Sequence, residues 1–132
     1  MARQFVLSIA ILLLATAAVA QDGLTIPAQA KPPQLAEQAH EIYLAACATV
    51  QQEFGRSHPP RPKVTLVLGA DVDGVLREKG EVRLRKWDRH LFAQGVVVLA
   101  FGELMPTEEK LTMAERAVSW ADATVKVQQL RK

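Results

Sequence analysis

The sequence predicts an α+β fold built as one small domain. Apolar residues recur at spacings of three and four in residues 34–54, which is typical of an amphipathic helix. Residues 63–69 alternate as in a strand, and residues 89–105 form a mainly apolar stretch of about 17 residues, too long for a typical strand. A chain of 132 residues, 49% apolar and 23% charged, has room for one such domain and no second.

The first 20 residues are predicted to be a cleaved signal peptide. Arg3 supplies the positive start, residues 5–15 are almost wholly apolar, and residues 18–20 (Ala-Val-Ala) provide the small side chains that a signal peptidase needs. The alternative is an uncleaved anchor, but the apolar run is about 16 residues, shorter than the roughly 20 that a spanning helix needs. We therefore expect an exported protein, periplasmic or secreted, that begins near Gln21 and has no stable membrane insertion after cleavage.

Charge argues against nucleic acid as a partner. Without Arg3 the chain carries 15 basic and 14 acidic side chains, so no overall field attracts nucleic acid or an anionic membrane. Residues 77–89 hold six basic side chains against three acidic ones, with Trp87 as the only aromatic residue, which is too few to stack successive bases. We interpret this segment as a solvated strand face and expect no nucleic-acid partner.

The predicted mature chain begins with an extended arm, residues 21–33, which holds three prolines and little periodicity. The single domain is expected to span residues 34–132. Its first helix ends at Gly55, before the proline-rich connection of residues 56–62. Cys47, the only cysteine, falls in this helix; we expect a buried core thiol, with pairing to a second chain as the alternative. The apolar stripe of the helix is Leu35, Ala39, Ile42, Ala46, Val50 and Phe54.

Two strands follow the proline-rich connection. Residues 63–69 place apolar side chains on both faces, which indicates a strand buried on both sides. Residues 71–74, Asp-Val-Asp-Gly, are similar to the start of a calcium loop, but the later glycine and acid of such a loop are absent, and we interpret them as a turn. In residues 81–85, Val82 and Leu84 point inward and charged residues point outward. This pattern predicts a half-exposed strand at the edge of the sheet, guarded by charge.

Two helices complete the predicted fold. Asp88 is expected to be an N-cap and Pro106 a stop, so the apolar stretch between them is predicted to be a long central helix despite its three consecutive valines. Thr107 is the expected cap of the last helix, which has two acids in its first turn. The apolar stripe of that helix is Leu111, Ala114, Val118, Ala121 and Val125.

The order of these elements resembles the minimal core of the zincin metallopeptidases, of the small gluzincin type. A helix, a proline-rich loop, a strand, a turn, a charged strand, a long helix and a second helix follow one another across residues 34–127. The long helix of that family carries His-Glu-x-x-His, and this chain has Gln94, Gly95 and Val98 at the three functional positions. The resemblance therefore implies a degenerate member without zinc ligands or catalytic base. It also implies a third ligand position on the last helix, where Glu115 is the nearest acid.

An ordinary core helix is the competing interpretation of residues 89–105. A helix packed by a sheet and two other helices is apolar all round. Gly95 would let a neighbouring element approach closely, despite a cost of about 1 kcal/mol in helix propensity. Under this interpretation the chain is a small exported protein of bacterial type with no zincin ancestry. Both interpretations predict that no metal and no other cofactor is bound.

No other catalytic constellation stands out in the sequence. His40, His58 and His90 have no serine or cysteine at a recognised catalytic spacing, and there is no glycine-rich phosphate loop or Cys-x-x-Cys. Asp71 and Asp73 could converge with His90 near the strand ends to form a titrating site. We therefore hypothesise an exported, non-catalytic binding domain. A small envelope hydrolase with an unrecognised site is the alternative.

The predicted binding surface is the strand of residues 81–85. In zincin-like folds the outer strand borders the cleft, and an extended peptide can pair with it. Glu81, Arg83 and Arg85 point outward and are the predicted contacts for an extended peptide or an envelope protein. The competing interpretation is that these charges only prevent edge-to-edge aggregation. The sequence predicts no oligomeric state.

Overall fold

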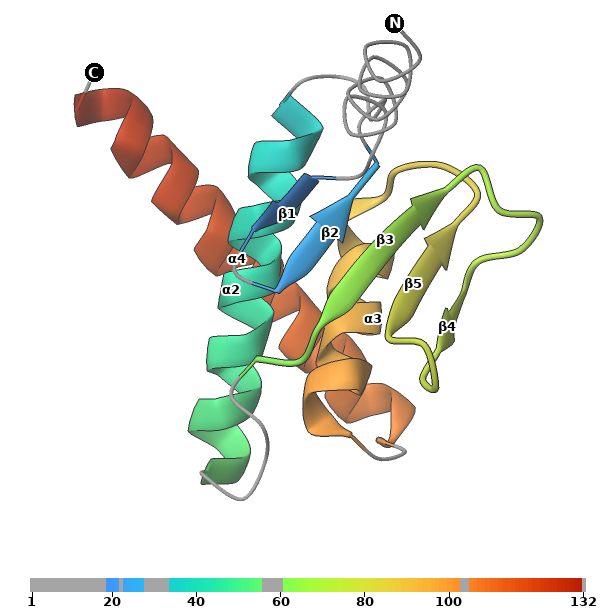
Figure 1. Ribbon diagram of the computed structural model, residues 1–132. Coiled ribbons are helices and arrows are strands. Elements are labelled where there is room, and N and C mark those ends of the chain that lie inside the picture. Colours follow the sequence, from blue (N-terminus) through green and yellow to red (C-terminus); the bar gives the residue numbers. More distant parts are fainter. Residues whose placement is uncertain (1–18, 22, 28–33, 56–60, 103–104, 132) are drawn as a thin grey trace, which may run out of the picture.

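The computed structural model describes residues 19–21, 23–27, 34–55, 61–102 and 105–131, and it confirms the predicted α+β class (Figure 1). A five-stranded mixed sheet and three helices make up this part of the chain. In chain order the elements are β1 (Val19–Gln21), β2 (Leu24–Ile26), α2 (Gln34–Phe54), β3 (Val64–Leu68), β4 (Gly74–Leu76), β5 (Glu81–Leu84), α3 (Arg89–Phe101) and α4 (Thr107–Arg131).

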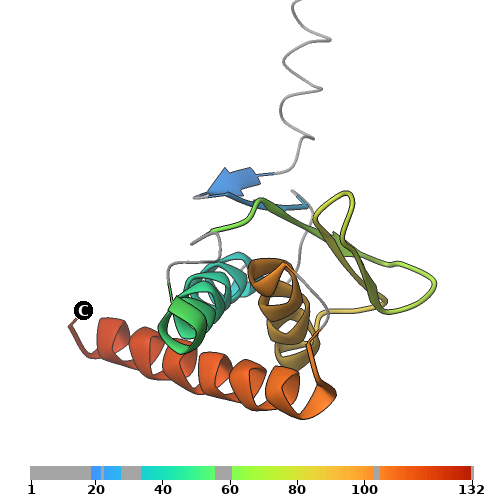
Figure 2. The ribbon, with the colours of Figure 1, turned by 90° about the horizontal axis from the view of Figure 1, so that it is seen from below.

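The sheet forms the first of three layers (Figure 2). Its strand order is β1-β2-β3-β5-β4, with β2, β3 and β5 parallel and with β1 and β4 antiparallel at the two edges. α2 and α3 lie side by side against one face of the sheet, and α4 crosses them on their far side. The described helices therefore all lie on the same side of the sheet.

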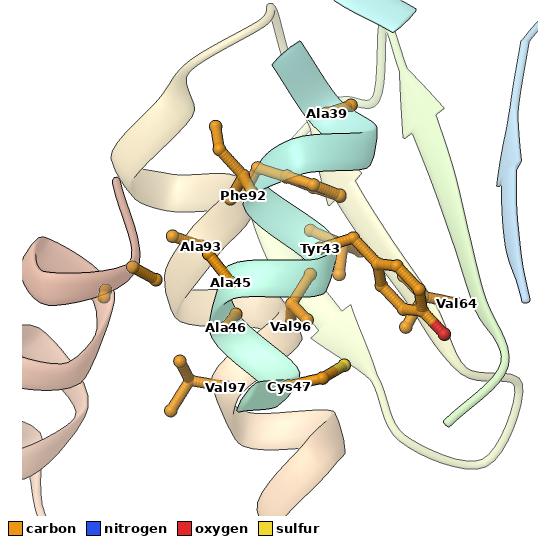
Figure 3. Packing of buried hydrophobic residues seen from close by; sticks show 14 of the residues in the cluster. Ala39, Tyr43, Ala45, Ala46, Cys47, Val64, Phe92, Ala93, Val96 and Val97 are labelled. Carbon is orange, nitrogen blue, oxygen red and sulfur yellow. The ribbon is translucent and has the colours of Figure 1, made fainter. Parts of the chain in front are cut away.

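The core fills the space between the sheet and the helices. Alternate residues of β2, β3 and β5 point toward the helices, and six of them are buried: Leu24, Ile26, Val64, Leu66, Val82 and Leu84. Tyr43 and Phe92 are the largest fully buried side chains, and Figure 3 shows them among small residues of α2 and α3. The Tyr43 hydroxyl donates a hydrogen bond to the carbonyl oxygen of Pro62 at 2.7 Å, so its polar atom is satisfied in the core.

α3 is the central helix predicted from the apolar stretch, but it is shorter than expected. Asp88 caps its N-terminus, because the Asp88 carboxylate accepts a hydrogen bond from the backbone N–H of Leu91 at 3.0 Å. The helix ends at Phe101 instead of continuing to Pro106, because Gly102 takes the left-handed conformation with φ of 81°. This glycine stop limits α3 to 13 residues.

The charged strand predicted at residues 81–85 is not at the edge of the sheet. β5 lies between β3 and β4, so both of its sides are paired. The edge is β4, a strand of three residues that begins at the end of the predicted turn. A strand this short carries too little alternation to be recognised from the sequence. The inward orientation of Val82 and Leu84 is confirmed, since both side chains are buried.

The predicted arm of residues 21–33 contributes a strand to the sheet, which corrects the expected start of the domain. Leu24 and Ile26 of β2 are buried, and β2 pairs with β3. Residues 22 and 28–33 of the arm lie outside the described residues. β1 spans the predicted cleavage point, and residues 1–18 of the predicted signal peptide also lie outside the described part of the chain.

Cys47 is a buried core residue, as expected from its place in the first helix. Desolvation by burial raises the pKa of its thiol to about 12, and the positive charge of Arg61 opposes this shift. A thiol with this pKa is neutral and unreactive at physiological pH. Its burial also keeps it from reaching a second chain in the folded state, which argues against the alternative of intermolecular pairing.

Candidate functional site

A cleft of about 420 Å³ lies between β4, α3 and the first turn of α4. β4 and its flanking residues form one wall, β5 forms the floor, and α3 forms the other wall. This volume falls in the range of roughly 300–1,000 Å³ that is common for ligand sites. The lining residues are Asp73, Gly74, Val75, Arg77, Val82, Leu84, Leu91, Gln94, Gly95, Val98, Met105 and Lys110.

The three positions aligned with the zincin motif lie together in the α3 wall of this cleft. Gln94, Gly95 and Val98 all line it. The spacing of four residues places Gln94 and Val98 one above the other on the same side of the helix. Both are half-buried, whereas Gly95 is buried. The structure therefore gathers these positions on one surface, with an amide as the only polar side chain among them.

Gly95 lets α3 approach the sheet closely. A Cβ atom added to Gly95 would lie 2.7 Å from both γ carbons of Val82 and 3.3 Å from Cγ2 of Val75. Such separations are shorter than a van der Waals contact, so even a methyl group requires the valine side chains or α3 to shift. The space beside Gly95 is thus occupied by the side chains of Val82 and Val75.

The α4 side of the cleft differs from what the resemblance implies. Glu115, the nearest acid to the implied third ligand position, is exposed and does not line the cleft. Lys110, in the first turn of α4, lines it instead. Among the described residues no three His, Cys, Asp or Glu side chains gather as a metal site would require. Glutamine and valine do not replace imidazole as zinc ligands.

β4 is fixed to the rest of the domain at both ends. At its start, the Asp73 carboxylate accepts a hydrogen bond from the backbone N–H of Arg85 at 2.8 Å and pairs with Nε of the same residue at 3.3 Å. After its end, the Arg77 guanidinium donates to the carbonyl oxygen of Gly102, the C-cap of α3. The cleft therefore runs along α3 between an Asp73 end and an Arg77 end. Lys110 lies at the Arg77 end, since α4 begins shortly after Gly102.

The predicted contacts on β5 do not line the cleft. Val82 and Leu84 form its floor, so the alternate residues Glu81 and Arg83 point to the opposite face of the sheet. Arg85 is held in the ion pair at the start of β4. The strand that borders the cleft is thus β4, whereas the predicted contacts lie on β5 and directly after it.

The predicted titrating site does not form. Asp73 is turned toward Arg85, while Asp71 and His90 are exposed and line neither wall of the cleft. His58 lies outside the described residues. The Asp-Val-Asp-Gly segment instead leads into β4, with its second aspartate fastening that strand to β5.

Sequence reasoning missed several contributors to the cleft, including Val75, Arg77, Met105 and Lys110. Each becomes part of the site only through tertiary packing, because β4 is too short to be predicted and α3 ends earlier than its proline stop suggests. One signal was available for Lys110. The first turn of a helix that follows a short connection must lie near the end of the preceding helix, which limits the candidates to residues 107–110.

No protein-family model, curated protein or solved structure matches the chain. Within the described ranges, no helix has both the length and the apolar character needed to cross a bilayer.

Proposed function

We propose that the protein is an exported, non-catalytic domain that binds an extended peptide in the cleft between β4 and α3. The observation that carries the proposal is an antiparallel edge strand with no strand neighbour on its outer side in the described structure, placed directly beside an open cleft. The outward N–H and C=O groups of an edge strand can pair with an added strand. Backbone pairing of this kind needs no particular peptide sequence.

The cleft would provide specificity through alternate side chains of the peptide. Side chains of an added strand point alternately to its two faces, so every second one would enter the cleft. Val75, Val98 and Met105 offer apolar contacts there, and the Gln94 amide can both donate and accept a hydrogen bond. An extended segment with apolar residues at alternate positions would fit this lining.

The non-catalytic part of the proposal is supported by the residues at the motif positions. Gln94, Gly95 and Val98 supply neither a zinc ligand of the usual kind nor a base that accepts a proton at neutral pH. In the zincin family, which the chain resembles, the outer strand borders the peptide cleft. A degenerate member would keep that groove after losing the chemistry.

Metal analysis and a hydrolysis assay test this part directly. The purified protein should contain no stoichiometric zinc and should not cleave peptides. One tightly held zinc per chain would contradict both the proposal and the interpretation of α3.

Export is a separate part of the proposal and rests on residues 1–20 alone. Its partner would then be a segment of another envelope or secreted protein. Mass spectrometry of the exported protein should give an N-terminus near Gln21. An intact Met1 in the membrane fraction would contradict cleavage.

A pair of neighbouring substitutions on α3 tests the binding site. Val98→Phe would fill the cleft, whereas Leu99→Phe adds the same group at the next position, which lies outside the cleft. The probe is the peptide Gln-Gln-Val-Thr-Val with an N-terminal fluorescein and a C-terminal amide, followed by fluorescence anisotropy. We expect Val98→Phe to weaken binding by about tenfold or more, a loss of about 1.4 kcal/mol, and Leu99→Phe to change it by less than about twofold. Equal effects in two folded variants would place the peptide elsewhere.

A further inference from the structure

We infer that the cleft selects extended peptides that carry a carboxylate at the end lined by Arg77 and Lys110. This inference rests on the proposed peptide-binding function and adds the chemistry of the ligand. Its basis is the difference in charge between the two ends of the cleft.

The two ends differ because only one of them is neutralised. At the start of β4, the Asp73 carboxylate is paired with Arg85. At the other end, Arg77 and Lys110 both line the cleft, and Arg77 donates to the neutral carbonyl oxygen of Gly102. None of the ion pairs between described residues involves either of these two cations.

The described acids closest in sequence to Arg77 and Lys110 do not line the cleft. Glu108 and Glu109, in the first turn of α4, line a separate hollow between α2 and α4. Glu78 is exposed in the turn after β4 and lies in a different hollow, on the other side of Arg77. Among the described residues, the lining of the cleft therefore has two cations outside any ion pair, and its one carboxylate is paired with Arg85.

A ligand carboxylate suits this arrangement. The bond to Gly102 holds the Arg77 guanidinium in place, so its other N–H groups are oriented before the ligand arrives. Lys110 adds a second positive charge on the α4 side. Arg77 remains exposed, so a charge pair here is screened by water and contributes a modest preference.

The carboxylate can come from two sources. β4 runs from the Asp73 end of the cleft toward the Arg77 end. A peptide antiparallel to β4 would bring its N-terminal half to Arg77 and would supply a Glu or Asp side chain. A peptide parallel to β4 would bring its C-terminal carboxylate to the same place.

The affinities of four pentapeptides for the mature chain, measured by isothermal titration calorimetry, distinguish a side-chain carboxylate from a C-terminal one. Three have acetyl and amide ends and read Glu-Glu-Val-Thr-Val, Gln-Gln-Val-Thr-Val and Lys-Lys-Val-Thr-Val; the fourth is Gln-Gln-Val-Thr-Val with a free carboxylate. Two adjacent acids ensure that one of them faces the cleft in either register. We expect the Glu-Glu peptide or the free acid to bind about fivefold more tightly than the neutral amide at low salt, and Lys-Lys to bind more weakly. The preference should shrink as salt is added.

Matched variants locate the preference. Lys110→Gln should remove most of the carboxylate preference without affecting folding. Arg77→Gln should also reduce the carboxylate preference. Lys79→Gln, in the same turn as Arg77, and Lys126→Gln, further along α4, should retain it, since neither lysine lines the cleft.

Three outcomes would count against the account. Equal binding of all four peptides would overturn the inference and leave the proposed function standing. A carboxylate preference that survives in both Lys110→Gln and Arg77→Gln would overturn it as well. If no peptide bound, including the neutral amide, the proposed function would fall and the inference with it.

Discussion

The two sides of α3 meet different surroundings, although they belong to one helix of 13 residues. The side that packs into the helical layer is closed, and its residues Phe92, Ala93, Val96 and Val97 have no exposed surface (Figure 3). The side toward β4 is open, with Gln94 and Val98 half-buried at the cleft. The closed side therefore contributes most of the stability of α3, and the open side is the one that a ligand can reach.

Truncation of a side chain on the closed side should cause the largest loss of stability. Phe92 is fully buried, and the centroid of its ring lies 5.3 Å from the centroid of the Trp87 ring. Phe92→Ala should lower the free energy of unfolding by about 3–5 kcal/mol, because it removes buried apolar surface and leaves a cavity. Urea denaturation followed by circular dichroism measures this change.

Val98→Ala, on the open side, is matched in size with Val97→Ala, on the fully buried closed side. It removes a half-buried side chain at the cleft and should cost less than about 1.5 kcal/mol, since little apolar surface returns to water. Similar losses for the two variants would contradict the division between a closed and an open side.

The boundary between the two sides lies at Gly95, and a methyl group there should have the next largest effect. Gly95→Ala gains about 1 kcal/mol of helix propensity but forces Val82 and Val75 to move, which costs about 1–3 kcal/mol. We expect a net loss of stability, measured by the same denaturation.

Gly74→Ala is the control for this prediction. An added Cβ at Gly74 meets nothing within 4 Å, so its effect should be small. A Gly95→Ala variant more stable than wild type would show that α3 and the sheet are not in close contact at this point.

The difference between the two sides also explains what the sequence could predict. The closed side follows from apolar periodicity and from Asp88, whose capping role is visible in the chain itself. The open side depends on β4, which is too short to be recognised from the sequence, and on Gly102, which ends α3 before Pro106. A correct inward pattern at Val82 and Leu84 thus did not reveal which strand forms the edge, because strand order is a property of tertiary structure.

The pH dependence of stability should show the smallest effect, and it reports on the closed interior. The pKa of the Cys47 thiol is about 12 in the folded protein, where the thiol is buried, and 9.0 when it is not buried, as in the unfolded chain. The unfolded chain therefore loses the thiol proton first as pH rises. Well below pH 9 this group contributes no dependence, because the thiol is protonated in both states. Between pH 9 and 10 it should lower stability by about 1 kcal/mol.

Comparison with Cys47→Ala isolates this contribution, because tyrosine and lysine side chains titrate in both proteins. The slope of stability against pH above 9 should be less steep in the variant. Identical slopes would mean that water reaches the thiol in the folded state, and that the interior is less closed than the burial of Cys47 indicates.

The central claim is that an extended peptide pairs with the free edge of β4. Amide chemical-shift mapping of the ¹⁵N-labelled protein, titrated with the neutral Gln-Gln-Val-Thr-Val amide, tests it most directly. We predict that the largest changes fall on Gly74–Leu76 and on Gln94 and Val98, with β2 and the end of α4 unaffected. Changes confined to β2 or to residues 120–131 of α4 would contradict the account, because the peptide would then bind outside the cleft.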